Sequence, residues 1–427
     1  KNPWRDENQH ELKGFIEDRV KKLPEYKLLS ERYSGNTDSI MACLNRPHRT
    51  KVIDYQTGLK DTIMSTIDSL KYTLRFLHCG FVVVEPQTGK VKAWVGDVDF
   101  NYWQYDKVVA KRQPGSTFKL FIYTEAIRKG LCSCDTRVDS AINWSIKEED
   151  EIKIWMPQNA NRTFSNEEIT LKSAFARSIN SVAVQLTREF SPDSIVQLAQ
   201  SMGIKSNLRP IPSIGLGAED VSLLEMVTAY SIIVDEGEKH TPILVTRIED
   251  SDGNILYKNQ GESEKVLDYE TAFIMRDMLQ EGLRDEHGTS QRLKKYPIFK
   301  NTEYGGKTGT SSNYSDAWYM GISPKLVGGV WVGGEYRSIH FRDGAHGQGS
   351  QTALPIFGDF MSRVMRDKNL AHYQGLFGEP KQEISKTYNC EELEKKNIGE
   401  GFVNFWKKLF GRDKKDSINN DTTTSKN

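Results

Sequence analysis

The chain has 427 residues, enough for two or three domains and at least one large hydrophobic core. Lysine plus arginine equals aspartate plus glutamate at 58 each, so the formal net charge is zero and no basic excess indicates nucleic acid as a partner. No apolar run approaches the length needed to cross a bilayer, and no signal peptide is visible. The chain begins at Lys1 rather than at a methionine, which we interpret as a processed or shortened product.

Cysteine usage argues against both a disulfide framework and a zinc site. The five cysteines, Cys43, Cys79, Cys132, Cys134 and Cys390, are too few and too scattered for a framework. Cys132 and Cys134 lack the second pair that zinc spacing requires. We interpret them as buried free thiols, with room for one long-range disulfide if the compartment is oxidising.

The first 75 residues are charged and mixed in character and contain no motif. Their apolar pattern predicts a helix over Glu11–Lys22 and short strands with turns over Pro47–Met64. We interpret residues 1–75 as a linker or a small accessory domain.

Two β-branched runs follow, Phe81–Glu85 and Val91–Val95. The turn between them, Pro86–Gly89, contains a glycine, which favours a β-hairpin.

The stretch after this hairpin holds a candidate nucleophile. Pro114 and Gly115 end an extended segment, and an apolar helical pattern begins at Phe118. The spacing puts Ser116 in the first turn of a helix, near the positive end of its dipole, with Lys119 one turn later on the same face. A lysine in a dry site can become neutral enough to take the serine proton. Ser-x-x-Lys is common by chance, however, so the alternative is a solvated helix start.

Residues 165–285 are mostly helical by their apolar period. The predicted helices run from about Pro192 to Met202, from Ser222 to Val234 and from Tyr269 to Leu283. Ser191 is a plausible cap for the first of these, with Pro192 as the first helical residue.

Within this region, two polar residues, Ser178 and Asn180, interrupt the apolar segments Leu171–Phe175 and Val182–Leu186. Because serine and asparagine favour caps and turns, the pattern predicts a junction between two helices. Gly215-Leu216-Gly217 lacks the third glycine and the flanking strand of a nucleotide loop, so we reject that interpretation.

The last third of the chain returns to strands, predicted over Gly305–Thr310, Ala317–Ile322 and Val327–Val332. With the earlier hairpin they can form one antiparallel sheet that has the helical region inserted between its parts, which is an α+β architecture. Beyond Met365 the pattern decays, and Asp413–Asn427 is polar and is predicted to be disordered.

Three motifs now stand in one order: Ser116-x-x-Lys119, Ser178-Ile179-Asn180 and Lys307-Thr308-Gly309-Thr310. Together they resemble the signature of the penicillin-binding proteins and serine β-lactamases. Further stretches look like the transpeptidase domain of class A (bifunctional) penicillin-binding proteins: Arg112–Lys119, Met156–Asn159, Gly215–Glu219, Asp316–Trp318 and Ala353–Ile356. The resemblance covers roughly residues 76–365, and implies the penicillin-binding/β-lactamase-like fold, with 1–75 as accessory segment and 366–427 as C-terminal extension.

The sequence departs from the family pattern at a few points. Ile179, which precedes Asn180, stands where β-lactamases commonly have aspartate, which favours the penicillin-binding branch. Gly96-Asp97 stands where the class A pattern usually shows two glycines, a change that we expect a strand end to tolerate. The glycosyltransferase domain that normally precedes this one is not recognisable, and residues 1–75 resemble only the connecting segment.

The resemblance implies a role for each motif residue. Ser116 would attack the penultimate D-alanine carbonyl of a peptidoglycan stem peptide, with Lys119 as proton acceptor, while Ser178 and Asn180 would relay the proton and hold the substrate amide.

The third motif would bind the substrate. Lys307 would face the substrate carboxylate, with the hydroxyls of Thr308 and Thr310 as further donors, and Gly309 would let the substrate lie close to the strand edge. The backbone N–H groups of Ser116 and Thr310 would form the oxyanion hole, worth about 3–4 kcal/mol per donor.

The implied partners are stem peptides, as D-Ala-D-Ala donor and amine acceptor, and β-lactam antibiotics. The resemblance implies no metal or organic cofactor. The implied location is the periplasm at the outer face of the inner membrane, with a membrane-anchored parent protein. The alternatives are a D-alanyl-D-alanine carboxypeptidase, a β-lactamase or a β-lactam-sensing domain. Glu167 and Glu168 precede the Ser178 motif, unlike the deacylating glutamate of class A β-lactamases, so a penicilloyl ester on Ser116 is expected to persist.

Two expectations concern the C-terminal extension. In a periplasmic domain Cys134 and Cys390 are a candidate disulfide that would tie the tail to the domain, with Cys132 competing for the same partner. Residues 402–412 alternate aromatic, aliphatic and basic side chains; we favour a helix docked on its own domain over one lying on a membrane.

Overall fold

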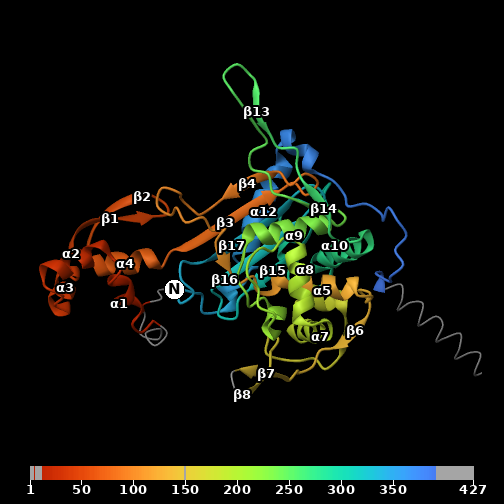
Figure 1. Cartoon of the computed structure of the whole chain (residues 1–427), viewed down its shortest axis with the longest axis horizontal. Helices are drawn as coiled ribbons and strands as arrows, with labels where there is room; N and C mark the ends of the chain where they lie inside the picture. The colour runs from red at the N-terminus through yellow and green to blue at the C-terminus, as the bar shows by residue number, and fades with distance from the viewer. Residues whose placement is uncertain (1–3, 5–11, 149–150, 391–427) are drawn as a thin grey trace, which may run out of the picture.

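The computed structural model describes Trp4 and residues 12–148 and 151–390. An N-terminal module lies to one side of a larger body that is built on a central sheet (Figure 1). Within these ranges, none of the helices is both long enough and apolar enough to cross a membrane. The expectations for residues 402–412 and 413–427 fall outside the described residues.

The N-terminal module consists of short helices and one hairpin. Its elements are α1 (Phe15–Val20), α2 (Pro24–Arg32), α3 (Thr37–Leu44), β1 (His48–Asp54), β2 (Gly58–Met64) and α4 (Thr66–Leu74). Its own small core is formed by Val20, Ile40, Leu44 and Ile67. The helix predicted over Glu11–Lys22 is shorter in the structure, because Gly14 takes a left-handed conformation before α1 and Pro24 starts the next helix.

A five-stranded antiparallel sheet forms the centre of the larger body. Its strands are β3 (Leu77–Val84), β4 (Val91–Val95), β15 (Gly305–Thr310), β16 (Asp316–Ile322) and β17 (Val327–Gly334). The spatial order is β15-β16-β17-β3-β4, so strands far apart in sequence pair directly. The predicted sheet, made of the N-terminal hairpin and three C-terminal strands, is confirmed. The third motif lies on β15, at an open edge of the sheet.

Helices cover both faces of this sheet. On one face Trp318, Met320 and Trp331 belong to the main hydrophobic core, which the helical region shares. On the other face Tyr319 packs with Phe357 of α12 (Ala353–Arg366) in a second cluster. The alternation along β16 follows from the strand period of two.

Among the described residues, the inserted region supplies six α-helices. They are α5 (Lys119–Arg128), α6 (Leu171–Arg177), α7 (Asn180–Phe190), α8 (Pro192–Ser201), α9 (Leu223–Val234) and α10 (Tyr269–Arg284). As predicted, Pro192 starts α8, and the Ser191 hydroxyl accepts a hydrogen bond from the backbone N–H of Ser194. Helix α5 is buried from Lys119 to Ile127, which makes it the central helix of the body.

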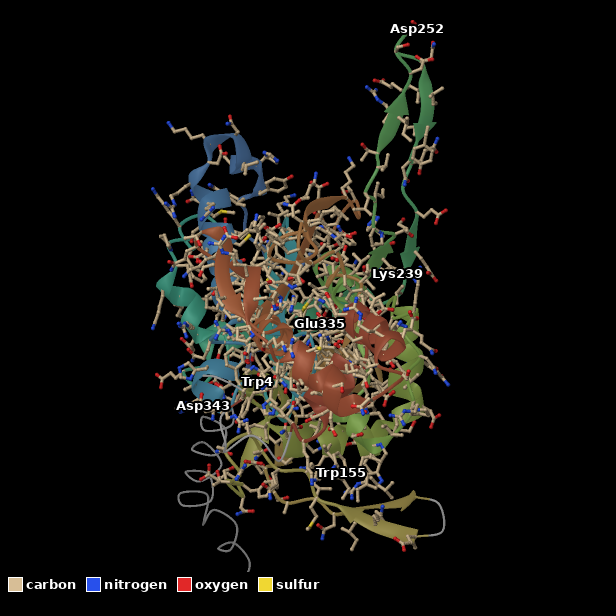
Figure 2. All side chains as sticks on the ribbon, turned by 90° about the vertical axis from the view of Figure 1, so that its left-hand side faces the viewer. Trp4, Trp155, Lys239, Asp252, Glu335 and Asp343 are labelled. Atoms are coloured by element: carbon tan, nitrogen blue, oxygen red, sulfur yellow. A yellow bond between two sulfur atoms is a disulfide. The ribbon has the colours of Figure 1, made fainter. Side chains whose placement is uncertain are left out.

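Short strands and turns complete the body. They are β5 (Lys111–Arg112), β6 (Thr136–Val138), β7 (Trp144–Glu148), β8 (Glu151–Trp155), β9 (Glu168–Thr170), β10 (Val221–Ser222), β11 (Glu238–His240), β12 (Arg247–Glu249), β13 (Ile255–Lys258), β14 (Ser263–Lys265), α11 (Gly344–Gly347) and the 3-10 helices Gly115–Phe118, Pro212–Leu216, Gln291–Lys295 and Lys368–Tyr373. Figure 2 shows the β12–β13 hairpin, with Asp252 at its tip, and the β7–β8 hairpin, with Trp155, projecting at opposite ends of the molecule.

After α12 the chain returns across the helical region as an irregular strap. Lys386 Nζ donates to the carbonyl of Ile127 at 2.6 Å, and Ser385 Oγ donates to Glu270 at 2.9 Å. The strap ends at a disulfide between Cys134 and Cys390, the pairing expected for the tail, and Cys132 stays free.

Candidate active site

The nucleophile turn is held by glycine geometry. Gly115 has a φ of 53°, and Ser116 lies in a 3-10 helix, Gly115–Phe118, that runs directly into α5. A Cβ at position 115 would lie 2.5 Å from the carbonyl oxygen of Thr310. Ser116 is partly exposed while Gly115 and Thr117 are buried, so the serine is the accessible residue of this turn.

The loop rejected as a nucleotide site packs against this turn. Gly217 has a φ of 71°, and a Cβ there would overlap with the backbone of Gly115. The N–H of Gly115 donates to the carbonyl of Gly217 at 3.3 Å. The glycines therefore allow a close backbone approach that holds the Ser116 turn.

Lys119 lies at the centre of the first two motifs. Its fully buried Nζ donates to Ser178 O and Asn180 Oδ1, both at 2.7 Å, and lies 3.3 Å from Ser178 Oγ and Ile179 O. The pKa of Lys119 lies well below its usual range. Burial is the larger cause, and the positive charge of Lys307 is the smaller one. The environment thus favours the neutral amine, the form that can accept a proton.

The second motif forms the predicted helix junction. Helix α6 ends at Arg177, Ser178 takes a left-handed conformation with a φ of 62°, and α7 begins at Asn180. Asn180 Nδ2 donates to the carbonyl of Gln158 at 2.8 Å, which leaves Oδ1 facing Lys119. The junction thus presents four oxygens to one amine: Ser178 O, Ser178 Oγ, Ile179 O and Asn180 Oδ1.

The third motif brings a second lysine to the same side of the sheet. Lys307 pairs with Met320, its side chain is 1 % exposed, and its Nζ lies 5.7 Å from the centroid of the Phe175 ring. Burial lowers the pKa of Lys307 to about 7.

The end of β15 lies directly against the nucleophile turn. A Cβ on Gly309 would overlap with the carbonyl of Pro114 and approach Thr117, so only glycine fits. The backbones of Ser116 and Thr310, the expected oxyanion donors, are thereby adjacent. Thr310 Oγ1 accepts from the N–H of Gly349 at 3.1 Å, and its own hydroxyl proton remains a donor. Thr308 is buried and pairs with Tyr319.

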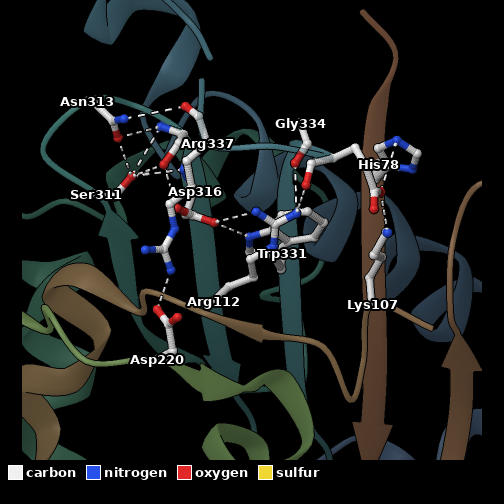
Figure 3. Close-up of polar contacts among 12 residues, drawn as sticks. His78, Lys107, Arg112, Asp220, Ser311, Asn313, Asp316, Trp331, Gly334 and Arg337 are labelled. Atoms are coloured by element: carbon white, nitrogen blue, oxygen red, sulfur yellow. Dashed lines mark hydrogen bonds and ion pairs between the residues drawn. The ribbon is translucent and has the colours of Figure 1, made fainter. Parts of the chain in front are cut away.

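A buried arginine anchors the strand that leads to Ser116 (Figure 3). Arg112 Nη2 donates to the carbonyls of Gly334 and Glu335 at 2.8 and 2.9 Å. Its guanidinium lies 4.6 Å from the Trp331 ring and 3.9 Å from the buried carboxylate of Asp316. The nucleophile turn is therefore tied to the far end of β17.

The Gly96-Asp97 departure is accommodated by a buried polar cluster beside this anchor. Asp97 Oδ2 lies 2.7 Å from His78 Nδ1, and the N–H of Val98 donates to Asp97 Oδ1 at 2.7 Å. Lys107 Nζ lies 2.6 Å from Glu335 and 3.9 Å from Asp97. The extra carboxylate is thus paired rather than left unsatisfied in the interior.

The residues that the motif analysis missed are those that hold the motifs in place. Arg112 belongs to the family-like stretch Arg112–Lys119, and Gly217 belongs to the loop rejected as a nucleotide site. Asp139, whose carboxylate accepts a hydrogen bond from Ser181 of α7, belongs to none of the motifs. No local pattern marks them, because their partners are distant in sequence. Among the described residues, no cluster of three or more His, Cys, Asp or Glu side chains could hold a metal ion.

Comparison with known proteins gives two matches to families. Residues 79–362 match the penicillin binding protein transpeptidase domain, and residues 1–77 match the penicillin-binding protein middle domain.

The chain is also similar to individual proteins. It is 34% identical to penicillin-binding protein 2D of Bacillus subtilis over 60% of this chain and 37% of the relative. It is 33% identical to penicillin-binding protein 1A of Aquifex aeolicus over 68% of this chain and 38% of the relative. It therefore spans less than half the length of these curated relatives.

A solved structure shares the fold. The PonA1 protein of Mycobacterium tuberculosis in complex with penicillin V matches with a TM-score of 0.61 and 18% identity, over 88% of this chain and 98% of that one. Because the family match takes in the sheet, the inserted helices and all three motifs, this chain belongs to the penicillin-binding protein transpeptidase domain family.

Proposed function

We propose that this chain is a D,D-transpeptidase that cross-links peptidoglycan stem peptides through a serine acyl-enzyme and that β-lactams inhibit it. The observation that carries the proposal is the environment of Lys119. A fully buried amine lies one turn from Ser116 and against the Ser178–Asn180 junction, with a second lysine, Lys307, close enough to lower its pKa.

In the acylation step, neutral Lys119 accepts the hydroxyl proton of Ser116. The serine oxygen attacks the carbonyl carbon of the penultimate D-alanine, and the C–N bond to the terminal D-alanine breaks. The leaving amine takes a proton back from the Lys119–Ser178 pair, whose atoms lie 3.3 Å apart. An ester on Ser116 and free D-alanine result.

Binding and charge stabilisation come from β15. Lys307 in its protonated form attracts the terminal carboxylate of the donor peptide, with the hydroxyls of Thr308 and Thr310 as donors. The backbone N–H groups of Ser116 and Thr310 donate to the oxyanion as it forms. Gly309 leaves the strand edge open for the donor backbone.

The acceptor amine of a second stem peptide then attacks the ester and releases Ser116. Water is the competing acceptor in a carboxypeptidase or a β-lactamase. Glu167 and Glu168 are both exposed, and Glu168 accepts a hydrogen bond from Thr136. Their position supports slow hydrolysis, since neither side chain is buried in the site.

We further propose that the domain works outside the cytoplasm, at the outer face of the inner membrane, as part of a membrane-anchored parent. Peptidoglycan is assembled there, and the disulfide between Cys134 and Cys390 is compatible with an oxidising compartment.

Labelling with a fluorescent penicillin tests the assignment of the nucleophile. Ser116→Ala is expected to abolish covalent labelling and to keep the wild-type melting temperature. The matched control is Ser263→Ala, a change at an exposed serine of β14, which is expected to label like wild type. Undiminished labelling of folded Ser116→Ala would refute the proposal.

The acceptor is tested with a D-Ala-D-Ala stem-peptide analogue plus an amine. A cross-linked product supports the transpeptidase. Exclusive hydrolysis would indicate a carboxypeptidase, and a single acylation without turnover of the peptide would indicate a sensor.

A further inference from the structure

Helix α7, which carries Asn180, starts at a residue that cannot cap it. The residue before it is Ile179, whose side chain has no hydrogen-bonding atom, although the first N–H groups of a helix have no partner within the helix. Asn159 supplies the cap from another segment. Its Oδ1 accepts from the N–H of Asn180 at 2.9 Å and from the N–H of Ser181 at 3.2 Å.

The orientation of Asn159 is determined by its remaining partners. Its Nδ2 donates to Asp139 Oδ1 at 2.8 Å and to the carbonyl of Thr163 at 2.9 Å. The amide side chain, which is 5 % exposed as a residue, thereby uses both donors and both acceptor positions. Only one of the two amide orientations satisfies all four contacts, so the side chain is held in a single position.

Asp139 contacts the same turn of α7 through the side chain of Ser181. Its Oδ1 also accepts from Ser181 Oγ at 2.5 Å, and its Oδ2 accepts from the N–H and the hydroxyl of Ser165 at 3.0 and 3.2 Å. Burial tends to raise the pKa of Asp139, but the hydrogen bonds from Ser165, Ser181 and Asn159 outweigh it and lower the pKa overall. The carboxylate therefore stays ionised at neutral pH and remains an acceptor.

The same loop also sets the side chain of Asn180. Gln158, the neighbour of Asn159, supplies the carbonyl that accepts from Asn180 Nδ2. The Gln158–Asn159 pair thus holds both the main chain and the amide of Asn180, and turns Oδ1 toward Lys119 at 2.7 Å.

We propose that Asn159 and Asp139 are positioning residues. They hold the first turn of α7 so that Asn180 keeps the Lys119 amine in the position from which it takes the proton of Ser116. The inference rests on the proposed acyl-transfer function. It assigns no contact with substrate to either residue, because both act through Asn180.

The first test measures the second-order rate constant for acylation by a chromogenic β-lactam, together with the melting temperature. Asn159→Ala is expected to slow acylation about tenfold to hundredfold, because a 1 Å misplacement of a catalytic group can cost about 10²-fold. Asn161→Ala is the matched control, since Asn161 lies in the same loop and, within the described part of the chain, its exposed Oδ1 accepts only a local bond from the N–H of Thr163. The control is expected to stay within about twofold of wild type.

A double-mutant cycle separates positioning from a general effect on the fold. In an Asn180→Ala background, Asn159→Ala is expected to slow acylation by less than about twofold further, while its effect on the melting temperature persists. An equal loss of rate in both backgrounds would overturn the proposal.

Exchange of the two side chains provides a rescue that does not depend on Asn159→Ala folding. Asn159→Asp places two carboxylates side by side, so this variant is expected to be acylated slowly. Adding Asp139→Asn gives the pair one amide donor and one carboxylate again, with the two side chains exchanged. The double variant restores the bond between the two side chains but not the bond to the Thr163 carbonyl, so it is expected to regain about tenfold over Asn159→Asp without reaching the wild-type rate. A rate no higher than that of Asn159→Asp alone would contradict the assigned pairing. If wild type is not acylated at all, the proposed function fails; if wild type and Asn159→Ala acylate equally, only this inference fails.

Discussion

Burial of Lys307 predicts a pH dependence that applies only to ligands bearing a carboxylate. Its pKa is about 7, and burial is the cause. Because burial disfavours the ammonium, Lys307 is charged below that pH and neutral above it. A ligand carboxylate needs the charged form, so its recognition weakens as the pH rises through the pKa of Lys307.

The magnitude follows from the protonated fraction. With a pKa of about 7, Lys307 is about 90% protonated at pH 6, about half at pH 7 and about 3% at pH 8.5. Acylation by a carboxylate-bearing β-lactam is therefore expected to lose about 30-fold between pH 6 and pH 8.5 from this group alone. Lys119 contributes in the opposite sense, since it must lose its proton to act as base.

Comparing a penicillin with its methyl ester removes the contribution of Lys119, which acts on both ligands. Acylation is followed by intact-protein mass across the pH range, and the acid-to-ester ratio of rate constants is the measured quantity. We expect this ratio to fall about 30-fold from pH 6 to pH 8.5. In the Lys307→Met variant, the acid-to-ester ratio of acylation rate constants is expected to be small and independent of pH.

A ratio that is constant with pH in the wild-type protein would refute the reasoning. It would mean that Lys307 does not recognise the carboxylate, or that it stays charged throughout despite its burial.

Three further predictions concern the disulfide, the glycine contact and the acyl-enzyme. Cys390→Ser is expected to lower the free energy of unfolding by about 3–5 kcal/mol, since the bridge to Cys134 closes a loop with a sequence separation of 256; equal denaturation midpoints without reductant would contradict this. Gly217→Ala is expected to slow acylation at least about tenfold, whereas Gly253→Ala, also at positive φ but with nothing within 4 Å of its Cβ, is expected to leave acylation unchanged; similar rates for both variants would contradict the proposed packing contact. A one-to-one penicilloyl adduct on Ser116 is expected to persist for many minutes after rapid desalting; its loss within seconds, measured by intact mass, would indicate a β-lactamase.

Local patterning was sufficient to predict most secondary structure. The hairpin predicted from Phe81, whose first strand begins four residues earlier at Leu77 in the structure, and the helix that begins at Pro192 follow from alternation, apolar period and a cap, all of which act within a few residues. The helix predicted over Glu11–Lys22 was too long, because Gly14, which lies inside that span, takes a left-handed conformation and α1 ends at Val20.

The supporting contacts of the site were not predictable in the same way. Asn159 reads as a polar residue in a loop, and only the folded chain brings it to a helix that starts 21 residues later. Arg112 likewise reads as one more basic residue, although it donates to carbonyls more than 200 residues away. Such residues carry no period and no fixed spacing, so a single sequence gives no signal for their partners.

The sequence by itself determined which chemical groups are available and in what local setting: a serine one turn from Lys119, a polar junction at Ser178 and a strand that begins with two glycines before Lys307. Only the tertiary structure decided their reactivity. Folding buries both lysines near each other and directs Lys119 to oxygens 59 to 61 residues away. The pKa of an amine depends on the dielectric and the charges around it, and those are properties of the packed interior rather than of neighbouring residues in the chain.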